Sequence, residues 1–339
     1  MTIRCLRPLP VSLVLAGAVL ASAPLHAQPI ESLGTRALGM AGAFVAVADD
    51  PTAIYWNPAA LSLGRGGFAV EGQTLERIPG LGLDADRRRS FFIGAAAPSI
   101  GLAYYRLSAQ AVVADAAGPD GRNDARAPSP GLRSLVTDTV GLTLLQSLAE
   151  GIAVGGTIKY VYGNSAAGTP SGPIDPRDES AWLDEAAGLE GHGRGAFDYD
   201  LSAIARFSVV RLGVVARDMT EPTFVTPDGL ETKLERQVRA GVALQPTASV
   251  LVDVDVDLTR RLTIDGEERR RMAIGGEGSL GQHVQIRGGV RFDVEAPDEV
   301  VPAVGASLGL GRRFWVDVQV TLGTSQRDRG WGIGGRFAM

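Results

Sequence analysis

The sequence predicts an all-β protein, a transmembrane antiparallel β-barrel of about 14 strands with an N-terminal hatch inside its lumen. From residue 66 onwards, segments of about ten residues carry apolar side chains at every second position, and a strand that crosses an outer membrane at a tilt needs ~9–11 residues. The breaks between these segments alternate in length, as periplasmic turns and extracellular loops do. The stretch 34–63 fits neither a strand nor a membrane span, which indicates a separate plug.

Residues 1–27 are predicted to be a secretory signal peptide. Two arginines precede an apolar core at 11–23, and small residues around Ala27 suit cleavage. A short membrane anchor is the alternative, but the core is too short for a span and prolines flank it. The only cysteine, Cys5, lies in the part that is removed, so the mature chain suits export to an oxidising compartment.

Residues 28–63 are predicted to form the hatch. The segment is apolar, but Asp49 and Asp50 interrupt it, and prolines follow at Pro51 and Pro58. It therefore lacks the ~20 uninterrupted apolar residues that a spanning helix needs. Asp50 is expected to be a helix N-cap with Pro51 in the first turn, and Pro58 is expected to end that helix. The segment needs burial but is too short to build a core of its own.

Three short motifs in the hatch resemble a known family. Gly-Met-Ala-Gly-Ala-Phe at 39–44, Ala-Asp-Asp at 48–50 and Trp-Asn-Pro-Ala at 56–59 are similar to the hatch of the FadL-type outer-membrane transporters of hydrophobic compounds, in the FadL/TodX branch. The hatch of the related PorV-type barrels has a similar pattern and is the nearest alternative. The strand pattern extends the resemblance to the rest of the chain. The hatch motif residues are Asp49, Asp50, Asn57, Pro58 and Ala59.

The barrel is predicted to occupy residues 64–339. The alternating segments number about fourteen, an even number, as single-chain bacterial barrels have. The predicted strands are 66–77, 88–97, 100–107, 135–145, 152–163, 196–207, 209–218, 234–244, 249–258, 268–279, 283–292, 300–309, 312–321 and 330–339.

The breaks between these strands predict the topology. Short and long breaks alternate, which places the long ones outside the cell and both chain ends in the periplasm. The short breaks are 98–99, 147–151, 208, 245–248, 280–282 and 310–311. The long breaks are 78–87, 108–134, 164–195, 219–233, 259–267, 293–299 and 322–329.

Side-chain alternation predicts which face of the wall meets lipid. In 249–258, aliphatic residues share one face, and Asp253, Asp255 and Asp257 share the other. The aliphatic face must point outward, because carboxylates in hydrocarbon are costly. The three aspartates could hold a cation, but the favoured alternative is a lumen lining of both charges. The arginines that would neutralise them are Arg239, Arg271, Arg287 and Arg291.

Two groups of apolar residues are candidates for ligand contact. Those in the hatch could line a cavity or be the packing of the plug itself: Met40, Phe44, Tyr55 and Trp56. The FadL-type resemblance implies that the third and fourth long loops form an outer capture groove, and the alternative is a pair of self-packed surface loops. The loop residues of that groove would be Trp182, Leu183, Met219 and Phe224.

Two details of the hatch and wall are open from sequence. The amide of Asn57 could bind the backbone of the hatch or wall, or the Asn57-Pro58 pair could simply stop a helix. The FadL-type resemblance also implies a side exit at a kinked third strand. Gly101, which follows small residues at 94–97, permits a gap there.

The leading functional hypothesis is a bacterial outer-membrane channel for the passive uptake of small hydrophobic compounds, such as long-chain fatty acids or aromatic hydrocarbons. The expected partners are these molecules, outer-membrane lipid with lipopolysaccharide, and the barrel assembly machinery. The net charge of −5 with no basic patch argues against nucleic acid. No convergent catalytic or metal-ligating motif is visible, so we expect no enzyme activity, cofactor or metal.

The rival hypothesis is a PorV-like barrel that acts as a scaffold or shuttle for secreted proteins. The two hypotheses differ in the lumen. Transport predicts a continuous apolar tunnel from the long loops past Phe44 and Trp56, whereas a scaffold predicts a sealed lumen with a binding surface on the loops.

Overall fold

The structure is a computed structural model that describes residues 25–26, 33–77, 85–115, 129–172, 179–262, 264, 268–295, 300–323 and 329–339. Nearly all of the predicted signal peptide, 1–27, lies outside the described residues. Within these ranges no helix has the length and apolar character needed to cross a bilayer.

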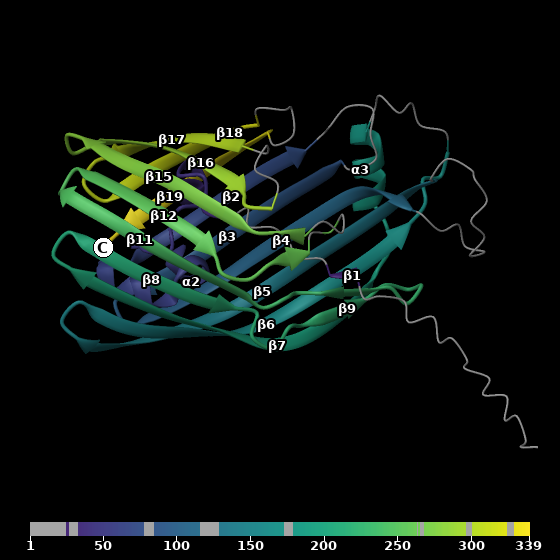
Figure 1. Cartoon of the computed structure of the whole chain (residues 1–339), viewed down its shortest axis with the longest axis horizontal. Helices are drawn as coiled ribbons and strands as arrows, with labels where there is room; N and C mark the ends of the chain where they lie inside the picture. The colour runs from purple at the N-terminus through teal and green to yellow at the C-terminus, as the bar shows by residue number, and fades with distance from the viewer. Residues whose placement is uncertain are drawn as a thin grey trace, which may run out of the picture.

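Fourteen strands form a closed barrel in which every strand pairs antiparallel with the next, and β19 returns to pair with β2 (Figure 1). Each predicted strand overlaps one of them, so the predicted strand number and fold class are confirmed. The barrel strands are β2 (Gly67–Arg77), β3 (Asp86–Ala97), β4 (Ile100–Asp115), β5 (Ser129–Ala149), β6 (Ile152–Gly168), β7 (His192–Phe207), β8 (Val210–Arg217), β11 (Gln237–Thr247), β12 (Val250–Asp257), β15 (Arg271–Leu280), β16 (Val284–Asp293), β17 (Val300–Leu310), β18 (Phe314–Leu322) and β19 (Arg329–Ala338).

Strands β4 to β7 are longer than the sequence predicts and project past their neighbours (Figure 1). The ladder between β4 and β5 runs from Ile100↔Leu144 to Asp115↔Ser129. Beyond the lipid-facing band the outer face no longer has to be apolar, so the alternation fades although the backbone pairing continues. Residues 108–115 and 129–134 of the predicted break at 108–134 are therefore strand, and 116–128 lie outside the described residues.

Short turns lie at one end of the barrel, and the longer connections lie at the other (Figure 1). Tight turns use left-handed backbone at Gly281 and Gly311, where φ is 67° and 84°. The longer connections carry small elements of their own. These are α3 (Glu179–Ala187), the hairpin of β9 (Thr223–Val225) and β10 (Glu231–Lys233), the hairpin of β13 (Arg261–Leu262) and β14 (Glu268–Arg269), and β1 (Leu25–His26), which pairs parallel with β10.

The two faces of the wall separate apolar from polar side chains, as predicted. Ile158, Leu201 and Val252 point outward and are 62%, 50% and 42% exposed. Asp253 and Asp317 point inward and are at most 1% exposed. A wall that is apolar outside and polar inside suits a barrel surrounded by lipid.

Residues 33–63, termed the N-terminal segment, lie inside this barrel (Figure 1). Apart from Asp49, every residue from 33 to 61 is buried. The segment has three short helices: α1 (Thr35–Gly39) contacts β16 to β19 and β2, α2 (Ala53–Trp56) contacts β4, and η1 (Pro58–Leu63) contacts β5 to β7. The wall therefore supplies the core that the segment cannot build alone.

The local chemistry of α2 differs slightly from the prediction. The helix begins at Ala53 and its N-cap is Thr52, so the expected N-cap at Asp50 is wrong. Asp50 instead folds the preceding turn, because its Oδ1 accepts from the backbone N of Thr52 at 2.9 Å. Pro58 ends α2 as predicted, since Asn57 has extended backbone with φ −164°.

Candidate functional site in the barrel lumen

Aromatic side chains hold the middle of the N-terminal segment together. The rings of Phe44 and Trp56 meet edge to face with centroids 6.0 Å apart, and Tyr55 lies 5.8 Å from Trp56. Tyr55 also meets Tyr105 of the wall at 5.4 Å, and Trp56 Nε1 donates to the carbonyl of Leu33 at 3.1 Å. Such ring pairs add ~0.5–1.5 kcal/mol each beyond simple burial. The aromatic group therefore links the two halves of the segment and joins it to β4.

The four predicted hatch ligand residues are all packed away in this state. Their exposed fractions are 0% or 1%: Met40, Phe44, Tyr55 and Trp56. Met40 abuts the inner wall, where a Cβ added to Gly275 would lie 2.8 Å from its Cβ. A ligand can touch these side chains only after the segment shifts, so their ligand contact stays a prediction.

Two aspartates of β12 serve different partners. Asp255 Oδ2 accepts from the backbone N of Phe44 at 2.8 Å and of Val45 at 2.9 Å, which ties the segment to the wall. Asp257 Oδ1 accepts from Arg239 Nε at 2.7 Å. Protein donors thus engage both carboxylates, in line with the predicted lumen lining.

Asn57 joins the two halves of the segment and reaches the wall. Its Nδ2 donates to the carbonyl of Val45 at 2.8 Å and to the carbonyl of Ala203 on β7 at 3.4 Å. The next contact follows at once, because Ala59 N donates to Ser202 Oγ at 2.8 Å. The amide therefore does more than stop a helix.

Arg36 is the central charge of the segment. Its Nε and Nη2 bind the two carboxylate oxygens of Glu277 on β15, each at 2.8 Å, and its Nη1 contacts Asp49 and Asp50. Burial alone would lower the pKa of the Arg36 guanidinium, but Asp49, Glu277 and Asp50 raise it well above its ordinary value. The guanidinium therefore stays charged and ties α1 and the Asp49-Asp50 turn to β15 of the wall.

Glycines on the inner wall let the backbone of the segment approach closely. A Cβ at Gly155 would lie 2.7 Å from Ala59 N, and one at Gly213 would lie 2.7 Å from the carbonyl oxygen of Val45. These distances are shorter than van der Waals contact, and the opposing atoms are backbone. The close packing of the N-terminal segment against the inner wall thus depends on the absence of side chains at these positions.

We expect Gly155→Ala to loosen the segment by about 1–3 kcal/mol, because the added methyl group overpacks against Ala59. Loosening should appear as ion conductance in planar bilayers. Gly72→Ala is the matched control, since its added Cβ points outward and meets its nearest atom at 3.9 Å. Equal conductance of the two variants would contradict the claim that close packing of the segment against Gly155 holds it in place.

The lumen cavities beside the segment are small. A polar one of about 200 Å³ lies at the short-turn end, between Arg36, Asp49 and Arg336. Another of about 20 Å³ lies on the other side, between Tyr55 and Lys159. Pockets for small molecules usually measure ~300–1,000 Å³. Neither cavity forms the continuous apolar tunnel that transport predicts.

One lysine fills an acidic cluster above the segment. Lys159 Nζ lies 2.9 Å from Asp198, 2.7 Å from Asp200 and 2.8 Å from Asp218. The three carboxylates lie close enough together to resemble a metal site. The ammonium group occupies the place that an ion would take, so the cluster is a buried salt bridge that ties β6 to β7 and to the end of β8.

The predicted loop residues do not assemble into one groove. Trp182 and Leu183 of α3 pack with Val112 and Leu132 in one cluster. Phe224 packs in another cluster, with its ring over Gly163. Met219 is half-buried, and its backbone N donates to the carbonyl of Tyr199 at 3.2 Å. This arrangement matches the self-packed alternative, and a capture role stays a prediction.

The wall at the predicted side exit is continuous. Strands β3 and β4 pair without a break from Asp86↔Ala111 to Ala97↔Ile100. Gly101 makes room for the segment, because a Cβ there would lie 2.8 Å from Ile54 Cδ1. No gap interrupts the described pairing of β3 with β4, and a side exit here stays a prediction.

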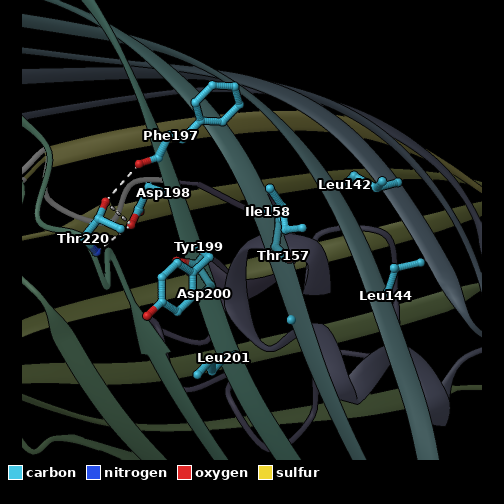
Figure 2. Close-up of a pocket in the computed structure, with 11 residues that line it drawn as sticks. Leu142, Leu144, Thr157, Ile158, Phe197, Asp198, Tyr199, Asp200, Leu201 and Thr220 are labelled. Atoms are coloured by element: carbon cyan, nitrogen blue, oxygen red, sulfur yellow. Dashed lines mark hydrogen bonds between the residues drawn. The ribbon is translucent and has the colours of Figure 1, made fainter.

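A groove of about 550 Å³ lies on the outer, lipid-facing surface of β5 to β7. Figure 2 shows its apolar side chains and, at one edge, Thr220 Oγ1, which donates to Asp198 and to the carbonyl of Phe197. Outward side chains stand around Gly156, which has none. They are Leu142, Leu144, Ile158, Phe197, Tyr199 and Leu201.

Comparisons with known proteins give matches among solved structures. No family model matches the chain, and no curated protein does. The Ralstonia pickettii toluene transporter TbuX superimposes with a TM-score of 0.60 at 13% identity, over 91% of this chain and 98% of that one. The monoaromatic hydrocarbon channel CymD gives 0.61 at 11% identity, over 94% and 98%. A Pseudomonas aeruginosa FadL homologue gives 0.56 at 10% identity, over 93% and 100%.

The chain has the FadL-type fold. The match spans nearly the whole length of both chains, so the FadL-type architecture describes the complete barrel. At these identities it establishes the fold alone.

Several residues that position the segment within this FadL-type barrel were missed by sequence reasoning. Arg36 and Lys159 were not singled out, nor was Glu71, whose carboxylate accepts from the backbone N of Thr35. A cation inside an otherwise apolar stretch with two aspartates was the available signal for Arg36. For Lys159 the signal was its rarity, since the chain has only one other lysine, Lys233.

Proposed function

We propose that the chain is a bacterial outer-membrane channel for the passive uptake of small hydrophobic compounds, in which the N-terminal segment acts as a hatch. The barrel architecture supports this proposal, together with the FadL-type fold of structures described as toluene and monoaromatic hydrocarbon transporters. Lipopolysaccharide would surround the apolar outer face of the barrel, and the barrel assembly machinery would insert the protein into the membrane. No catalytic step, cofactor or metal is part of the proposal.

The way the segment is seated carries the proposal. It contacts the wall through side-chain hydrogen bonds and ion pairs, such as those of Asp255 and Arg36. It adds no strand to the barrel sheet, so it can shift without breaking the ladder that holds the wall together. An apolar solute that enters from the long-loop end would then meet Tyr55, Trp56 and Phe44.

Uptake can be measured in a bacterial host that lacks its own channel of this class. Cells that produce the chain are expected to accumulate radiolabelled toluene or fatty acid faster than empty-vector cells, and the initial rate should survive an uncoupler because the process is passive. Labelled sucrose is the control for leakage and should not enter faster. Equal uptake of every apolar compound tried, with and without the chain, would count against transport.

A second candidate is the secretion scaffold, because the small cavities beside the segment fit its expectation of a sealed lumen. This role predicts that deletion of the gene in its own host leaves uptake of apolar compounds unchanged and causes secreted proteins to accumulate in the periplasm. Transport predicts the reverse pair of results.

A further inference from the structure

The groove on the outer surface of β5 to β7 has its floor at Gly156. In the barrel sheet Gly156 lies between Leu144 of β5 and Leu201 of β7, so a position without a side chain stands between two large ones. Figure 2 shows these walls, with Leu144 on one side, Ile158 on the middle strand and Leu201 on the other side. The volume of about 550 Å³ falls within the ~300–1,000 Å³ of sites that hold small molecules.

The groove is bounded on the β8 side by a step in the wall. The ladder between β7 and β8 ends at Leu201, and among the described residues no strand pairs with the rest of β7 on that side. The backbone N of Met219 donates there to the carbonyl of Tyr199 at 3.2 Å. Thr220 Oγ1 donates to the carbonyl of Phe197 at 3.0 Å. Phe197 is left 73% exposed, more than any other large hydrophobic side chain in the described ranges.

The medium around this face and the shape of the groove together predict its occupant. The outward side chains that line it are aliphatic or aromatic, apart from Thr220. An unfilled apolar void forfeits the dispersion contacts of its lining. Lipid tails are as apolar as leucine side chains, so a tail that fits the void is favoured by close packing. From Leu201 to Phe197 the groove follows β7 over about 13 Å, which suits a linear acyl chain.

Two tyrosines mark the depth at which such a chain would end. Tyr160 and Tyr162 point outward from β6 on the long-loop side of Gly156, and both are exposed. The ring of Tyr160 meets that of Phe197 with centroids 5.3 Å apart. Tyrosines gather at the level of the lipid head groups, where the ring meets hydrocarbon and the hydroxyl meets water. The groove thus runs from head-group level towards the middle of the wall at Gly156.

A cation stands at the long-loop end of the groove. Arg236 is exposed and continues the outward positions of β11, which include Val238. Its Nη2 donates to the carbonyl of Met219, at the edge of the groove, at 3.1 Å. Glu221 accepts from the backbone N of Arg236 at 3.3 Å, but its carboxylate pairs with Lys233 at 2.9 Å. Within the described part of the chain, no carboxylate pairs with the Arg236 guanidinium.

The position in the membrane identifies the lipid. Long connections mark the extracellular side of an outer-membrane barrel, so the groove opens in the outer leaflet. Lipopolysaccharide fills that leaflet, and its anchor carries several acyl chains beside phosphate groups. Arginine binds phosphate through paired N–H donors and keeps its charge. An acyl chain therefore suits the groove, and a phosphate group suits Arg236.

We propose that the groove and Arg236 form a binding site for lipopolysaccharide, in which one acyl chain lies over Gly156 and one phosphate contacts Arg236. The site holds this molecule more tightly than the lipids that merely surround the barrel, because it combines close packing with an ion pair. It does not depend on the uptake of apolar compounds.

The test uses the full-length protein, purified in a non-ionic detergent and stripped of lipid, and measures bound lipid by native mass spectrometry. The probes are lipid A, which is the acylated and phosphorylated anchor of lipopolysaccharide, lipid A without its phosphates, and phosphatidylglycerol. The variants are Gly156→Leu, which fills the floor, and Arg236→Gln. Gly335→Leu is the control for the first, since Gly335 faces outward on β19 and its added Cβ would meet its nearest atom at 3.6 Å. Arg312→Gln is the control for the second and removes a charge from an exposed short turn.

We expect the wild type and both controls to bind one lipid A, with a loss of tenfold or more in Gly156→Leu. Arg236→Gln should bind lipid A as weakly as the wild type binds the form without phosphates. Equal binding in Gly156→Leu and Gly335→Leu would overturn the groove, and equal binding in Arg236→Gln and Arg312→Gln would overturn the phosphate contact. Phosphatidylglycerol bound as tightly as lipid A would overturn the assignment to lipopolysaccharide.

A second variant covers the case in which Gly156→Leu disturbs the wall, since a Cβ there would meet the carbonyl oxygen of Asp200 at 3.1 Å. Leu201→Trp narrows the groove from its side, and Leu212→Trp makes the same exchange on the outer face of β8, away from the groove lining. Added lipid A should raise the melting temperature of the wild type and of Leu212→Trp, and not that of Leu201→Trp. An equal rise in all three proteins would contradict the proposal.

Discussion

Replacement of Arg36 by methionine is expected to free the N-terminal segment and open the lumen to ions. The substitution keeps much of the apolar volume, leaves Asp50 buried without its cation and takes from Glu277 one of its two arginine partners, the other being Arg287 at 3.2 Å. Removal of one partner from a buried ion pair costs about 3–5 kcal/mol. The segment is not part of the hydrogen-bonded barrel sheet. The lost free energy therefore weakens the binding of the segment to the wall and leaves the barrel itself intact. Planar-bilayer recordings should show a closed wild type and steady conductance in Arg36→Met.

Arg260→Met is the matched control for this experiment. Arg260 is 63% exposed and faces Glu295 at 3.2 Å, and such surface pairs contribute about 1 kcal/mol or less. The control should stay closed. A closed Arg36→Met barrel that melts at the wild-type temperature would show that the clamp does not hold the segment.

Replacement of Lys159 by alanine is expected to destabilise the barrel strongly and to create a calcium site. Asp198, Asp200 and Asp218 would lose their shared cation, at a cost of about 3–5 kcal/mol. Ca²⁺ takes oxygen ligands at ~2.3–2.6 Å. Three carboxylate oxygens within 4.8 Å of one another can therefore reach one ion. Thermal unfolding in detergent should show a lowered melting temperature that added Ca²⁺ largely restores.

Lys233→Ala is the natural comparison, because Lys233 is the only other lysine and its pair with Glu221 at 2.9 Å is partly exposed. It should unfold near the wild-type temperature and ignore Ca²⁺. If Lys159→Ala were as stable as Lys233→Ala, the three carboxylates would not depend on the buried ammonium group.

The strand number and the facing of the wall could be predicted from sequence because lipid imposes them. Each outward position of a spanning strand must be apolar, so Val252 and Val254 alternate with Asp253 and Asp255 in a pattern that any reader of the chain can see. The parts of β4 to β7 that project past their neighbours could not be predicted in this way, since no lipid constrains their outer faces.

The contacts that hold the N-terminal segment against the wall were only partly predictable. The sequence left two roles open for Asn57, a backbone hydrogen bond or a helix stop, and the structure shows both. The partner of Arg36 was not predictable, because Glu277 is 241 residues away in the chain and closure of the barrel alone brings them together. The separate packing of Trp182 and Phe224 likewise depends on long-range contacts with the walls beneath each loop.

The central claim, that movement of the N-terminal segment admits apolar compounds, can be tested with a reversible crosslink. A Cβ added to Gly334 would lie 3.2 Å from Thr35 Oγ1 and 2.8 Å from Glu71 Cγ. Cysteines at positions 334 and 35 therefore bring their sulphur atoms within bonding distance once the side chain of Glu71 rotates away. The only cysteine of the sequence, Cys5, lies in the predicted signal peptide, and the single-cysteine variants are the controls. The account predicts that the oxidised double variant takes up no toluene and that a reductant restores uptake. Uptake at the wild-type rate with the crosslink formed would contradict it.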